Sequence, residues 1–376
     1  MDISCKFPWT VNFVRLYDDS WKFCCKVGYN NYEKNIEIVN EVKDSFLKGQ
    51  RHIACQSCWI DEAQGGASFR TSEPGAKTTI NALQQNPTVG IIDLEFGDVC
   101  NMYCLSCGEY NSSTWQALLK RVPERDNKLE QTWEKLSEII KKNSTITHIN
   151  MHGGEPSIDP NFSIAVKNII ELGFKKKLRI ITNGNYSDSF KQKFENNIQS
   201  LINNGNEVEI VFSLDAAGSD GEWLRGGLNI SKFCANIKKM SEFDLNLSIS
   251  VNISISILNL ENHIDVLYLL ESIGLLNRVN LKINTVNHPK QLSISNLGSS
   301  TKDFLPKNWP VEMSESWSHY KKYFDSIISS QATTDIPPNN QMLIKLLETI
   351  DRYNVITKKP MTPYYENFID RIKNIC

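Results

Sequence analysis

Three cysteines, Cys100, Cys104 and Cys107, follow the apolar run Val89–Phe96 and hold a C-x3-C-x2-C spacing in the segment CNMYCLSC. Three thiolates this close in sequence can converge on one soft metal centre. A [4Fe–4S] cluster normally takes four protein thiolates, so a set of three leaves one iron open to another ligand. A buried structural zinc ion instead takes a closed set of four ligands. The missing fourth ligand therefore favours a catalytic centre.

Polar or glycine-rich segments also follow the next apolar runs of the chain, one after each run. Two adjacent glycines let a ligand approach the backbone closely, and a carboxylate that follows them can accept a hydrogen bond from an ammonium group. Serine and aspartate side chains suit the hydroxyls of a ribose. We therefore expect one shared ligand site from the ordered set Gly153-Gly154-Glu155-Pro156, Thr182-Asn183-Gly184, Ser213-Leu214-Asp215 and, within the fifth run, Asn252.

A second group of cysteines lies near the N-terminus and comprises Cys5, Cys24, Cys25, Cys55 and Cys58. An iron–sulfur cluster needs four of these five thiols, and the C-x2-C pair would contribute two of them. A four-cysteine zinc site uses the same element and would brace a small domain. Both interpretations stay open from the residues alone.

The composition is that of a globular protein in a reducing compartment. The 376 residues carry a formal charge of −2, which gives no electrostatic reason to expect nucleic-acid binding. No apolar stretch has membrane-spanning length, and the N-terminal sequence has no signal-peptide pattern, so we expect a cytoplasmic protein without a membrane partner. Eight of the ten cysteines precede residue 108, which favours metal binding over a disulfide framework.

The elements expected to position these residues alternate along the chain. Short β-branched or apolar runs are typical of strands buried on both faces, and helical patterns separate them. Such alternation predicts an α/β fold with a parallel sheet or barrel, in which chemistry lies at the carboxyl ends of the strands. The strands are expected at Val89–Phe96, Thr145–Met151, Leu178–Thr182, Glu207–Leu214, Leu245–Ser256 and Arg278–Val286.

Four segments follow from these patterns. Residues 1–75 are expected to form a small cysteine-rich domain, 76–88 a polar linker, 89–290 the barrel, and 291–376 a mixed, largely helical region that packs on the barrel. Helices are predicted at Ser112–Lys142 (broken near Pro123), Asn161–Leu172, Ser187–Asn203, Ser231–Phe243, Glu261–Ile273, Ser314–Ser330 and Gln341–Arg352.

From about residue 88 to 290 the chain resembles the core of the radical S-adenosylmethionine (radical SAM) superfamily. The resemblance implies a partial (β/α)6 TIM-like barrel whose Cys100, Cys104 and Cys107 bind a [4Fe–4S] cluster, with SAM on the open iron. By the same resemblance Gly153, Gly154, Glu155 and Pro156 match the GGEP motif that holds the SAM amino group. The remaining predicted SAM-binding residues are Thr182, Asn183, Ser213, Asp215, Asn252 and Arg225, the last facing the SAM carboxylate.

One position departs from the family pattern. An aromatic residue usually stands immediately before the third cysteine, near the adenine, whereas this chain has Ser106 there. Tyr103 and Phe96 are the two alternatives for that contact.

The N-terminal cysteines resemble half of the auxiliary-cluster extension called a twitch domain, a shortened SPASM domain. In most relatives this extension follows the barrel, and here it precedes it. The resemblance implies a second iron–sulfur cluster, for which we favour Cys5, Cys24, Cys55 and Cys58 as ligands, with Cys25 as the alternative to Cys24.

The resemblance therefore implies an enzyme that cleaves SAM to a 5′-deoxyadenosyl radical and performs oxidoreductase or transferase-type radical chemistry. An external one-electron donor of the flavodoxin or ferredoxin type would reduce the cluster. The leading substrate is a peptide that is oxidised or crosslinked, with the auxiliary cluster as electron acceptor. The alternative is a nucleotide or sugar, with structural zinc at the N-terminal cysteines. A non-catalytic iron–sulfur sensing or binding protein is the interpretation from another functional class.

Overall fold

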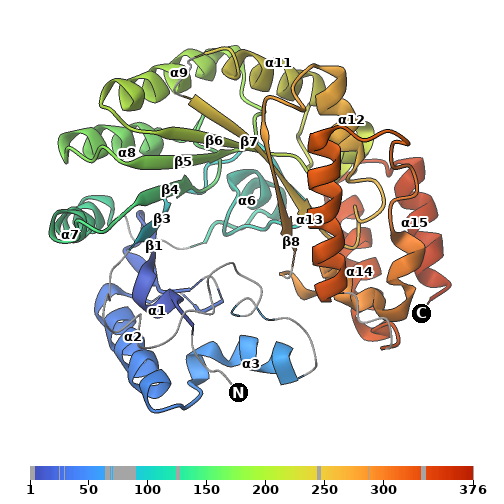
Figure 1. Cartoon of the computed structure of the whole chain (residues 1–376), viewed down its shortest axis with the longest axis horizontal. Helices are drawn as coiled ribbons and strands as arrows, with labels where there is room; N and C mark the ends of the chain where they lie inside the picture. The colour runs from blue at the N-terminus through green and yellow to red at the C-terminus, as the bar shows by residue number, and fades with distance from the viewer. Residues whose placement is uncertain are drawn as a thin grey trace.

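The computed structural model describes residues 5–24, 26–28, 30–63, 68, 70, 90–123, 128–243, 247–286, 288–331 and 336–375. Its centre is one eight-stranded sheet with the order β2-β1-β3-β4-β5-β6-β7-β8 (Figure 1). All neighbouring strands are parallel except β1 and β2, which pair antiparallel. The α/β fold with a mostly parallel, partial-barrel sheet is thus confirmed. The strands are β1 (Val11–Arg15), β2 (Ser20–Lys22), β3 (Ile91–Glu95), β4 (His148–His152), β5 (Lys177–Thr182), β6 (Val208–Ser213), β7 (Leu247–Ile255) and β8 (Asn280–Thr285).

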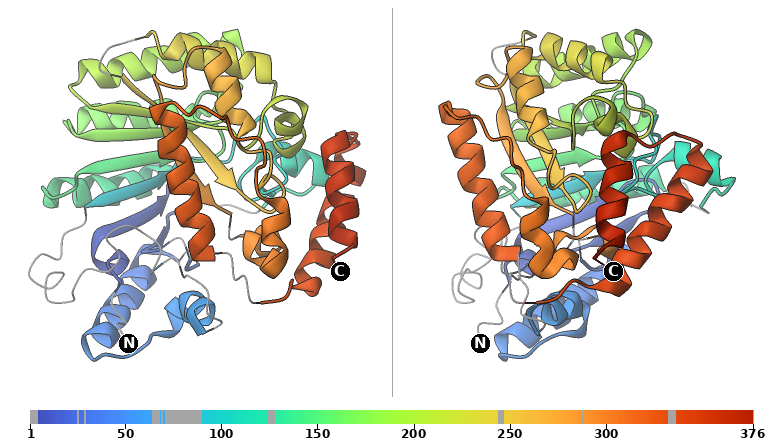
Figure 2. Two further views of the ribbon diagram at one scale, coloured as in Figure 1. Left: turned by 45° about the vertical axis from the view of Figure 1, so that its right-hand side comes forward. Right: turned by 90° about the vertical axis from the view of Figure 1, so that its right-hand side faces the viewer.

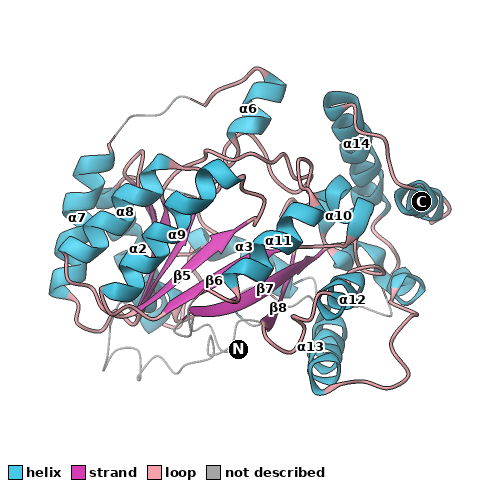
Figure 3. Cartoon of the chain, turned by 90° about the horizontal axis from the view of Figure 1, so that it is seen from above, coloured by secondary structure: helices cyan, strands magenta, loops and turns pink. Residues whose placement is uncertain are grey.

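Helices cover the outer face of this sheet, where α7, α8, α9 and α11 lie side by side (Figures 1 and 3). Phe212 of β6 packs on Phe233 of α11, with ring centroids 5.8 Å apart. Alternate residues of a strand point to opposite faces, so Glu209, Val211 and Ser213 face the inside of the partial barrel. The helices are α1 (Phe7–Thr10), α2 (Tyr32–Leu47), α3 (Gln56–Ala63), α6 (Ser113–Leu119), α7 (Leu129–Lys142), α8 (Pro160–Glu171), α9 (Asp188–Asn203), α10 (Gly218–Leu224), α11 (Ile230–Met240), α12 (Asp265–Ser272), α13 (Glu315–Gln331), α14 (Asn340–Thr357) and α15 (Pro363–Lys373).

The N-terminal segment, expected to form a domain of its own, contributes two strands to the main sheet. β1 runs parallel to β3 in continuous register from Val11–Ile91 to Arg15–Glu95. Val14 and Leu16 are fully buried in the main core, which explains this pairing, because β1 closes the edge of β3 that the barrel would otherwise expose. A second, smaller core of Phe7, Trp9, Phe23, Phe46, Trp59 and their neighbours holds α1, α2 and α3 together. The expected linker 76–88 lies outside the described residues.

The C-terminal region is helical, as expected, and lies beyond β8 (Figures 1 and 2). Helix α13 contacts β8, and α14 contacts α6, the helix that follows the cysteine loop. The 3-10 segments are Ile53–Cys55, Lys290–Leu292 and Ile294–Phe304. In the described part of the chain, helices with the length and apolar character needed to span a bilayer are absent.

Candidate functional site

The loop with Cys100, Cys104 and Cys107 begins after β3 and is fixed mainly through its backbone. The hydroxyl of Thr114, in the first turn of α6, donates to the Cys100 carbonyl at 2.6 Å. The Trp115 indole donates to the Cys104 carbonyl at 3.0 Å. The segment after α10 holds the other side, since the amide of Tyr103 donates to the Gly226 carbonyl at 2.7 Å. The loop is therefore held between two helices while its thiols stay available.

The three thiols influence one another electrostatically. The pKa of the Cys104 thiol is raised to about 12. Burial is the largest cause, negative charge on Cys107 also raises the pKa, and Arg225 opposes both effects. The pKa of Cys100 is raised by burial, by its two partner cysteines and by Glu155. Crowded thiolates repel one another, and a bound metal centre removes this repulsion because thiolate is the metal-binding form. The donor set therefore fits an iron–sulfur cluster.

The adjacent glycines of the loop after β4 are required by the cysteine loop itself. A Cβ on Gly153, whose φ is +155°, would lie 2.6 Å from the Gly97 carbonyl oxygen. A Cβ on Gly154 would lie 2.3 Å from the Val99 carbonyl oxygen. The close approach that the sequence predicted for a ligand is thus made by the backbone that leads into Cys100. Backbone hydrogen bonds from Gly154 to Gly97 and from Glu155 to Val99 hold the two loops in contact.

Glu155 joins the loop after β4 to the loop after β5. Its side chain is fully buried, and Oε1 accepts from the Thr182 hydroxyl at 2.6 Å and from the Ser157 amide at 3.0 Å. Oε2 accepts from the amide of Asn183 at 2.6 Å. Burial raises the pKa of Glu155, whereas these hydrogen bonds lower it. The carboxylate therefore holds Thr182 and Asn183 in place, and a contact between its side chain and SAM stays a prediction.

Asn183 connects the loop after β5 to the first cysteine. Its Nδ2 lies 3.9 Å from the Cys100 Sγ and donates to the Asn101 side chain at 2.9 Å. Asn101 in turn donates to the Asn185 carbonyl at 2.8 Å. The sequence analysis included Asn183 and missed Asn101 and Asn185, which the pattern of motifs does not distinguish from other asparagines. The structure thus brings the second and third motifs onto the cysteine loop.

Asp215 and Arg225 form a buried ion pair beside the cysteines. Arg225 Nη1 donates to Asp215 Oδ2 at 2.8 Å, and Asp215 Oδ1 accepts from the Ser254 amide at 3.0 Å. Among the described residues the Arg225 Nε is buried without a hydrogen-bond partner, and its guanidinium acts on the pKa of Cys104. A buried unpaired donor costs free energy, so this atom fits an anionic group bound at the site.

Ser213 and Asn252 are neighbours at the same edge of the sheet. They are register partners of β6 and β7. The Asn252 side chain donates to the Ser254 hydroxyl at 3.2 Å and accepts from Asn284 at 2.7 Å. The predicted SAM-binding positions therefore lie on the loops or strand ends at this edge, except Asn252, which lies within β7 beside the last residue of β6.

The two aromatic alternatives for the adenine contact separate clearly in the structure. Phe96 is fully buried and packs on Phe162 at 5.6 Å, so its ring belongs to the core. Tyr103 is only half-buried and lies between Trp115 and Tyr353, each 6.3 Å away. Tyr353 belongs to α14, far from Tyr103 along the chain, and no local sequence pattern predicts that the two rings are neighbours. Tyr103 remains the predicted adenine contact.

The four favoured N-terminal cysteines are also brought together. Cys5, Cys24, Cys55 and Cys58 all line one small cavity, with Arg70 at its edge. The pKa of the Cys5 thiol is raised to about 11, mainly by burial, and Cys58 contributes to this rise. The pKa of the Cys55 thiol is raised to about 12, again mainly by burial, with contributions from Cys5 and Cys58. Cys25, the alternative ligand, lies outside the described residues.

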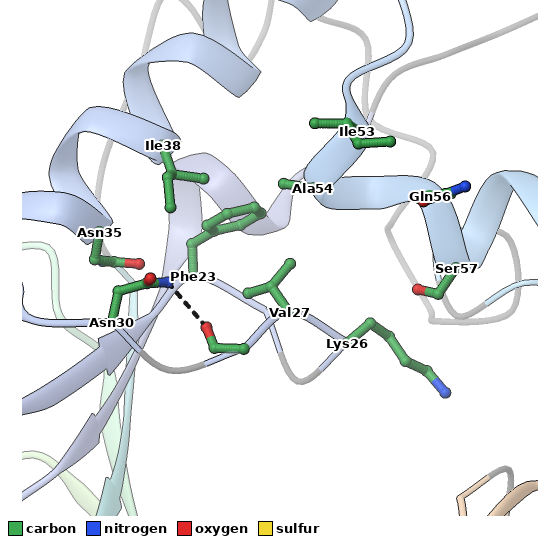
Figure 4. A pocket seen from close by; sticks show the side chains of 11 residues that line it. Phe23, Lys26, Val27, Asn30, Asn35, Ile38, Ile53, Ala54, Gln56 and Ser57 are labelled. Carbon is green, nitrogen blue, oxygen red and sulfur yellow. Dashed lines mark hydrogen bonds between the residues drawn. The ribbon is translucent and has the colours of Figure 1, made fainter.

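A larger cavity of about 300 Å³ adjoins this cysteine cavity (Figure 4). The two share part of their lining, including Phe23, Lys26 and Val27. Asn35 and Ile38 of α2 and Gln56 and Ser57 of α3 complete the larger one. The N-terminal cysteines therefore lie beside a space with mixed polar and apolar walls.

Across the described ranges, groups of three or more cysteine, histidine or acidic side chains gathered to hold a single metal ion are absent. Each thiolate of a [4Fe–4S] cluster binds a different iron, so a cluster does not require its sulfurs to meet around one ion.

Comparison with known proteins adds the family. Residues 94–273 match the model of the Radical SAM superfamily. Similar solved structures include native anSMEcpe with bound AdoMet, at 12% identity and a TM-score of 0.42. The alignment covers 65% of this chain and 63% of that protein, which is less than two thirds of its length. They also include Streptococcus suis SuiB bound to precursor peptide SuiA, at 12% identity and a TM-score of 0.40, in an alignment that covers 85% of this chain and 70% of that protein. A search of curated proteins finds no match.

The matched residues 94–273 contain the cysteine loop, the GGEP loop, Asp215 and Arg225. Membership implies a [4Fe–4S] cluster and SAM as cofactors, and the residues at the edge of the sheet fit both. Residues 94–273 of this chain are a domain of the Radical SAM superfamily, whose members are enzymes.

Proposed function

We propose that this protein cleaves SAM reductively and uses the resulting radical to oxidise or crosslink a peptide, with an electron passed to a second iron–sulfur cluster. The convergence of three loops on Cys100 and Cys104 carries the first half of this proposal. Asn183 contacts Cys100, Glu155 anchors Asn183, and Arg225 lies beside Cys104. When bound, the cluster supplies the electron that splits SAM into methionine and a 5′-deoxyadenosyl radical.

The residues of the chain then have distinct tasks. Arg225, oriented by its partner Asp215, would hold the SAM carboxylate, and the backbone carbonyls of Gly153 and Gly154 would hold its amino group. Ser213 would reach the ribose, and Tyr103 the adenine. Their shared task is to fix SAM in one orientation, because radical chemistry depends on position and on the exclusion of stray hydrogen donors.

The N-terminal site supports the second half of the proposal. Four cysteines line one cavity, and a space of about 300 Å³, the lower end of the range for ligand pockets, adjoins it. A peptide side chain could therefore come close to these thiols. An external one-electron donor of the flavodoxin or ferredoxin type would reduce the first cluster, and we propose a cytoplasmic location, in which free thiols persist.

One observation favours the alternative, structural zinc with a nucleotide or sugar as substrate. The free space among the four N-terminal cysteines is about 20 Å³, about that of one water-sized probe. A single ion therefore needs less movement of the cysteine side chains than a [4Fe–4S] cluster, and it still needs some, because the described residues hold no three such side chains already gathered around one point.

The deciding experiment counts iron, sulfide and zinc in anaerobically purified protein and measures 5′-deoxyadenosine. The wild type is compared with the variant Cys100→Ala/Cys104→Ala/Cys107→Ala. We expect about eight irons in the wild type, about four in the variant, and loss of 5′-deoxyadenosine in the variant. Persistent 5′-deoxyadenosine in the variant would refute the assignment of the triad. One zinc with about four irons in the wild type would show that the N-terminal cysteines bind a structural zinc ion in place of an auxiliary cluster.

A second pair of changes tests the role of the N-terminal site. Cys55→Ala/Cys58→Ala should leave SAM cleavage measurable while product from the true substrate is lost. Unchanged turnover would show that these cysteines only support the fold.

A further inference from the structure

The inner face of the sheet carries charged residues that the SAM site does not use. In register across five strands lie Phe13, Asp93, Asn150, Arg179 and Glu209. These residues stand before the strand ends, so they lie deeper in the partial barrel than the cysteine loop. Asp93 and Asn150 each stand two residues before the end of their strand, β3 and β4, and the cysteine loop begins only after β3. A substrate that enters the barrel next to the cluster therefore meets this row.

On the β5–β8 side of the row, two cations share one carboxylate. Glu209 Oε2 accepts from Arg179 Nε at 2.9 Å, and Glu209 Oε1 pairs with Lys282 and accepts from the Ser250 hydroxyl at 2.5 Å. Lys177 is also within 3.7 Å of Glu209, and Glu207 pairs with it at 2.8 Å. The two cations Arg179 and Lys282 and the one carboxylate of Glu209 thus carry a net charge of +1. We call these three residues the β5–β8 charge cluster.

The exposures within the β5–β8 charge cluster are unequal. The Glu209 side chain is 5% exposed, whereas those of Arg179 and Lys282 are each 31% exposed. Burial raises the pKa of Glu209, but hydrogen bonds from Lys282, Ser250 and Arg179 outweigh this and lower it to about 2. The carboxylate is therefore charged and buried, while the two cations remain partly exposed.

The opposite wall does not offer the same charge. His152 Nε2 lies 2.5 Å from Asp93 Oδ1, and Arg15 Nε lies 3.3 Å from Glu95 Oε1. Arg15 also lies 3.5 Å from Asp18, so this wall carries no excess of positive charge from these groups. Because opposite charges attract strongly in a partly enclosed site, a substrate anion is expected on the side of Arg179 and Lys282.

We propose that the β5–β8 charge cluster is a substrate subsite that binds an anionic group, a carboxylate or a phosphate, through Arg179 and Lys282. Glu209 lies between the two cations and neutralises part of their charge. This inference rests on the proposed function, and it narrows the substrate: a peptide would present an acidic side chain or its terminal carboxylate, and a nucleotide or sugar derivative its phosphate. Guanidinium and ammonium groups together suit both anions.

The test uses the full chain loaded with its metal centres and SAM, and two probes, glutarate and inorganic phosphate. Glutarate binding is measured by saturation-transfer NMR and phosphate binding by the width of its ³¹P signal. Lys282→Met should weaken binding of the preferred anion about tenfold or more, because one charge-assisted contact is lost. Lys282→Arg should retain it. Lys142→Met is the matched control, because it removes the same charge from a 74% exposed side chain on α7.

The variant Glu209→Gln separates a binding role from a structural one. Removing the carboxylate frees both cations, so the subsite model predicts tighter anion binding, whereas a purely structural network predicts no gain. Preference for glutarate would support a peptide carboxylate, and preference for phosphate would assign the subsite to a phosphorylated small molecule. Equal binding by wild type and Lys282→Met would overturn the subsite.

Failure of the subsite and failure of the proposed function give different results. Wild-type protein that forms 5′-deoxyadenosine but binds anions no better than Lys282→Met loses only the subsite. Wild-type protein that forms none loses the proposed function, whatever it binds.

Discussion

The two cysteine groups of this protein are assembled in different ways. At the edge of the sheet, Cys100, Cys104 and Cys107 belong to one loop, whose backbone is hydrogen-bonded to α6 and to the segment after α10. At the N-terminal site, Cys5, Cys24, Cys55 and Cys58 come from three separated segments, which pack around a small apolar core. A site made from one loop depends on close backbone packing, whereas a site made from several segments depends on the core behind it.

The largest effect should come from adding a side chain where two loops touch. In Gly154→Val the new Cβ would lie 2.3 Å from the Val99 carbonyl oxygen and would displace the backbone that leads into Cys100. A misplacement of about 1 Å near a reaction centre can cost about 100-fold in rate, so we expect 5′-deoxyadenosine formation to fall by at least about that factor, while N-terminal metal is retained.

Gly108→Ala is the matched control in the cysteine segment. A Cβ there meets no atom within 4 Å among the described residues, so the rate should stay close to that of the wild type. Equal rates for the Gly154 and Gly108 variants would show that contact between the loops is not what holds the triad.

A cavity in the small N-terminal core should have the opposite effect: loss of the N-terminal metal with SAM cleavage retained. Phe46 of α2 is fully buried and lies 6.2 Å from both Trp9 and Trp59. Phe46→Ala should cost about 3–5 kcal/mol of local stability, so metal at the N-terminal site should be lost, as metal analysis would detect. SAM cleavage should persist.

The exposed Ile36 of the same helix offers the control Ile36→Ala, which should retain both metal centres. If the Phe46 variant loses both centres together, the two regions fold as one unit and the comparison fails.

A smaller effect is expected from Asn183→Ala, which removes the side-chain contacts to Cys100 and Asn101. Loss of a hydrogen bond of this kind costs about 0.5–1.5 kcal/mol, so SAM cleavage should slow by a few-fold rather than stop. Steady-state 5′-deoxyadenosine formation measures this. The exposed Asn203→Ala on α9 serves as the control. A complete loss would mean that Asn183 contacts SAM directly.

The mildest comparison uses the metal-free protein. The thiol of Cys5 has a pKa of about 11 and that of Cys55 about 12, because both are buried. Only the thiolate reacts with iodoacetamide, so their alkylation rates should rise about tenfold per pH unit through pH 10. A model thiol such as glutathione should level off in that range. Peptide mapping should show Cys107, which is exposed, reacting before the buried Cys5. A plateau for Cys5 below pH 10 would show that burial does not control this site.

Much of the barrel could be predicted from sequence. Six apolar runs became β3 to β8, and the helical patterns between them became α6 to α9, α11 and α12. Strands buried by helices are nearly continuous apolar segments, so their signal is local. The strands β1 and β2 and the helices α1, α2, α3, α10 and α15 were missed. β1 reads VNFVR, in which only Val11 and Val14 are buried, too few for a clear alternation.

The candidate site shows the same division. The residue types and their spacing indicated the cysteine loop, the GGEP loop and the strand ends, because each is a short motif. The partners of these motifs were not predictable. Glu155 binds Thr182 and Asn183, Gly153 and Gly154 contact the cysteine loop, and Tyr353 approaches Tyr103 from α14. These contacts join segments far apart in the chain, so no local pattern records them.

The sequence by itself determined the residue types and their order: three closely spaced thiols, which predict a cluster with one open iron, and the motifs that predict a SAM site in the order of the strands. Only the tertiary structure decided how the N-terminal segment joins the sheet, which groups support the cysteine loop, and that Arg179 and Lys282 share Glu209 inside the barrel. The reason is physical. Residue type and spacing act over a few residues, whereas hydrogen bonds, ion pairs and burial between distant segments exist only after the chain has folded.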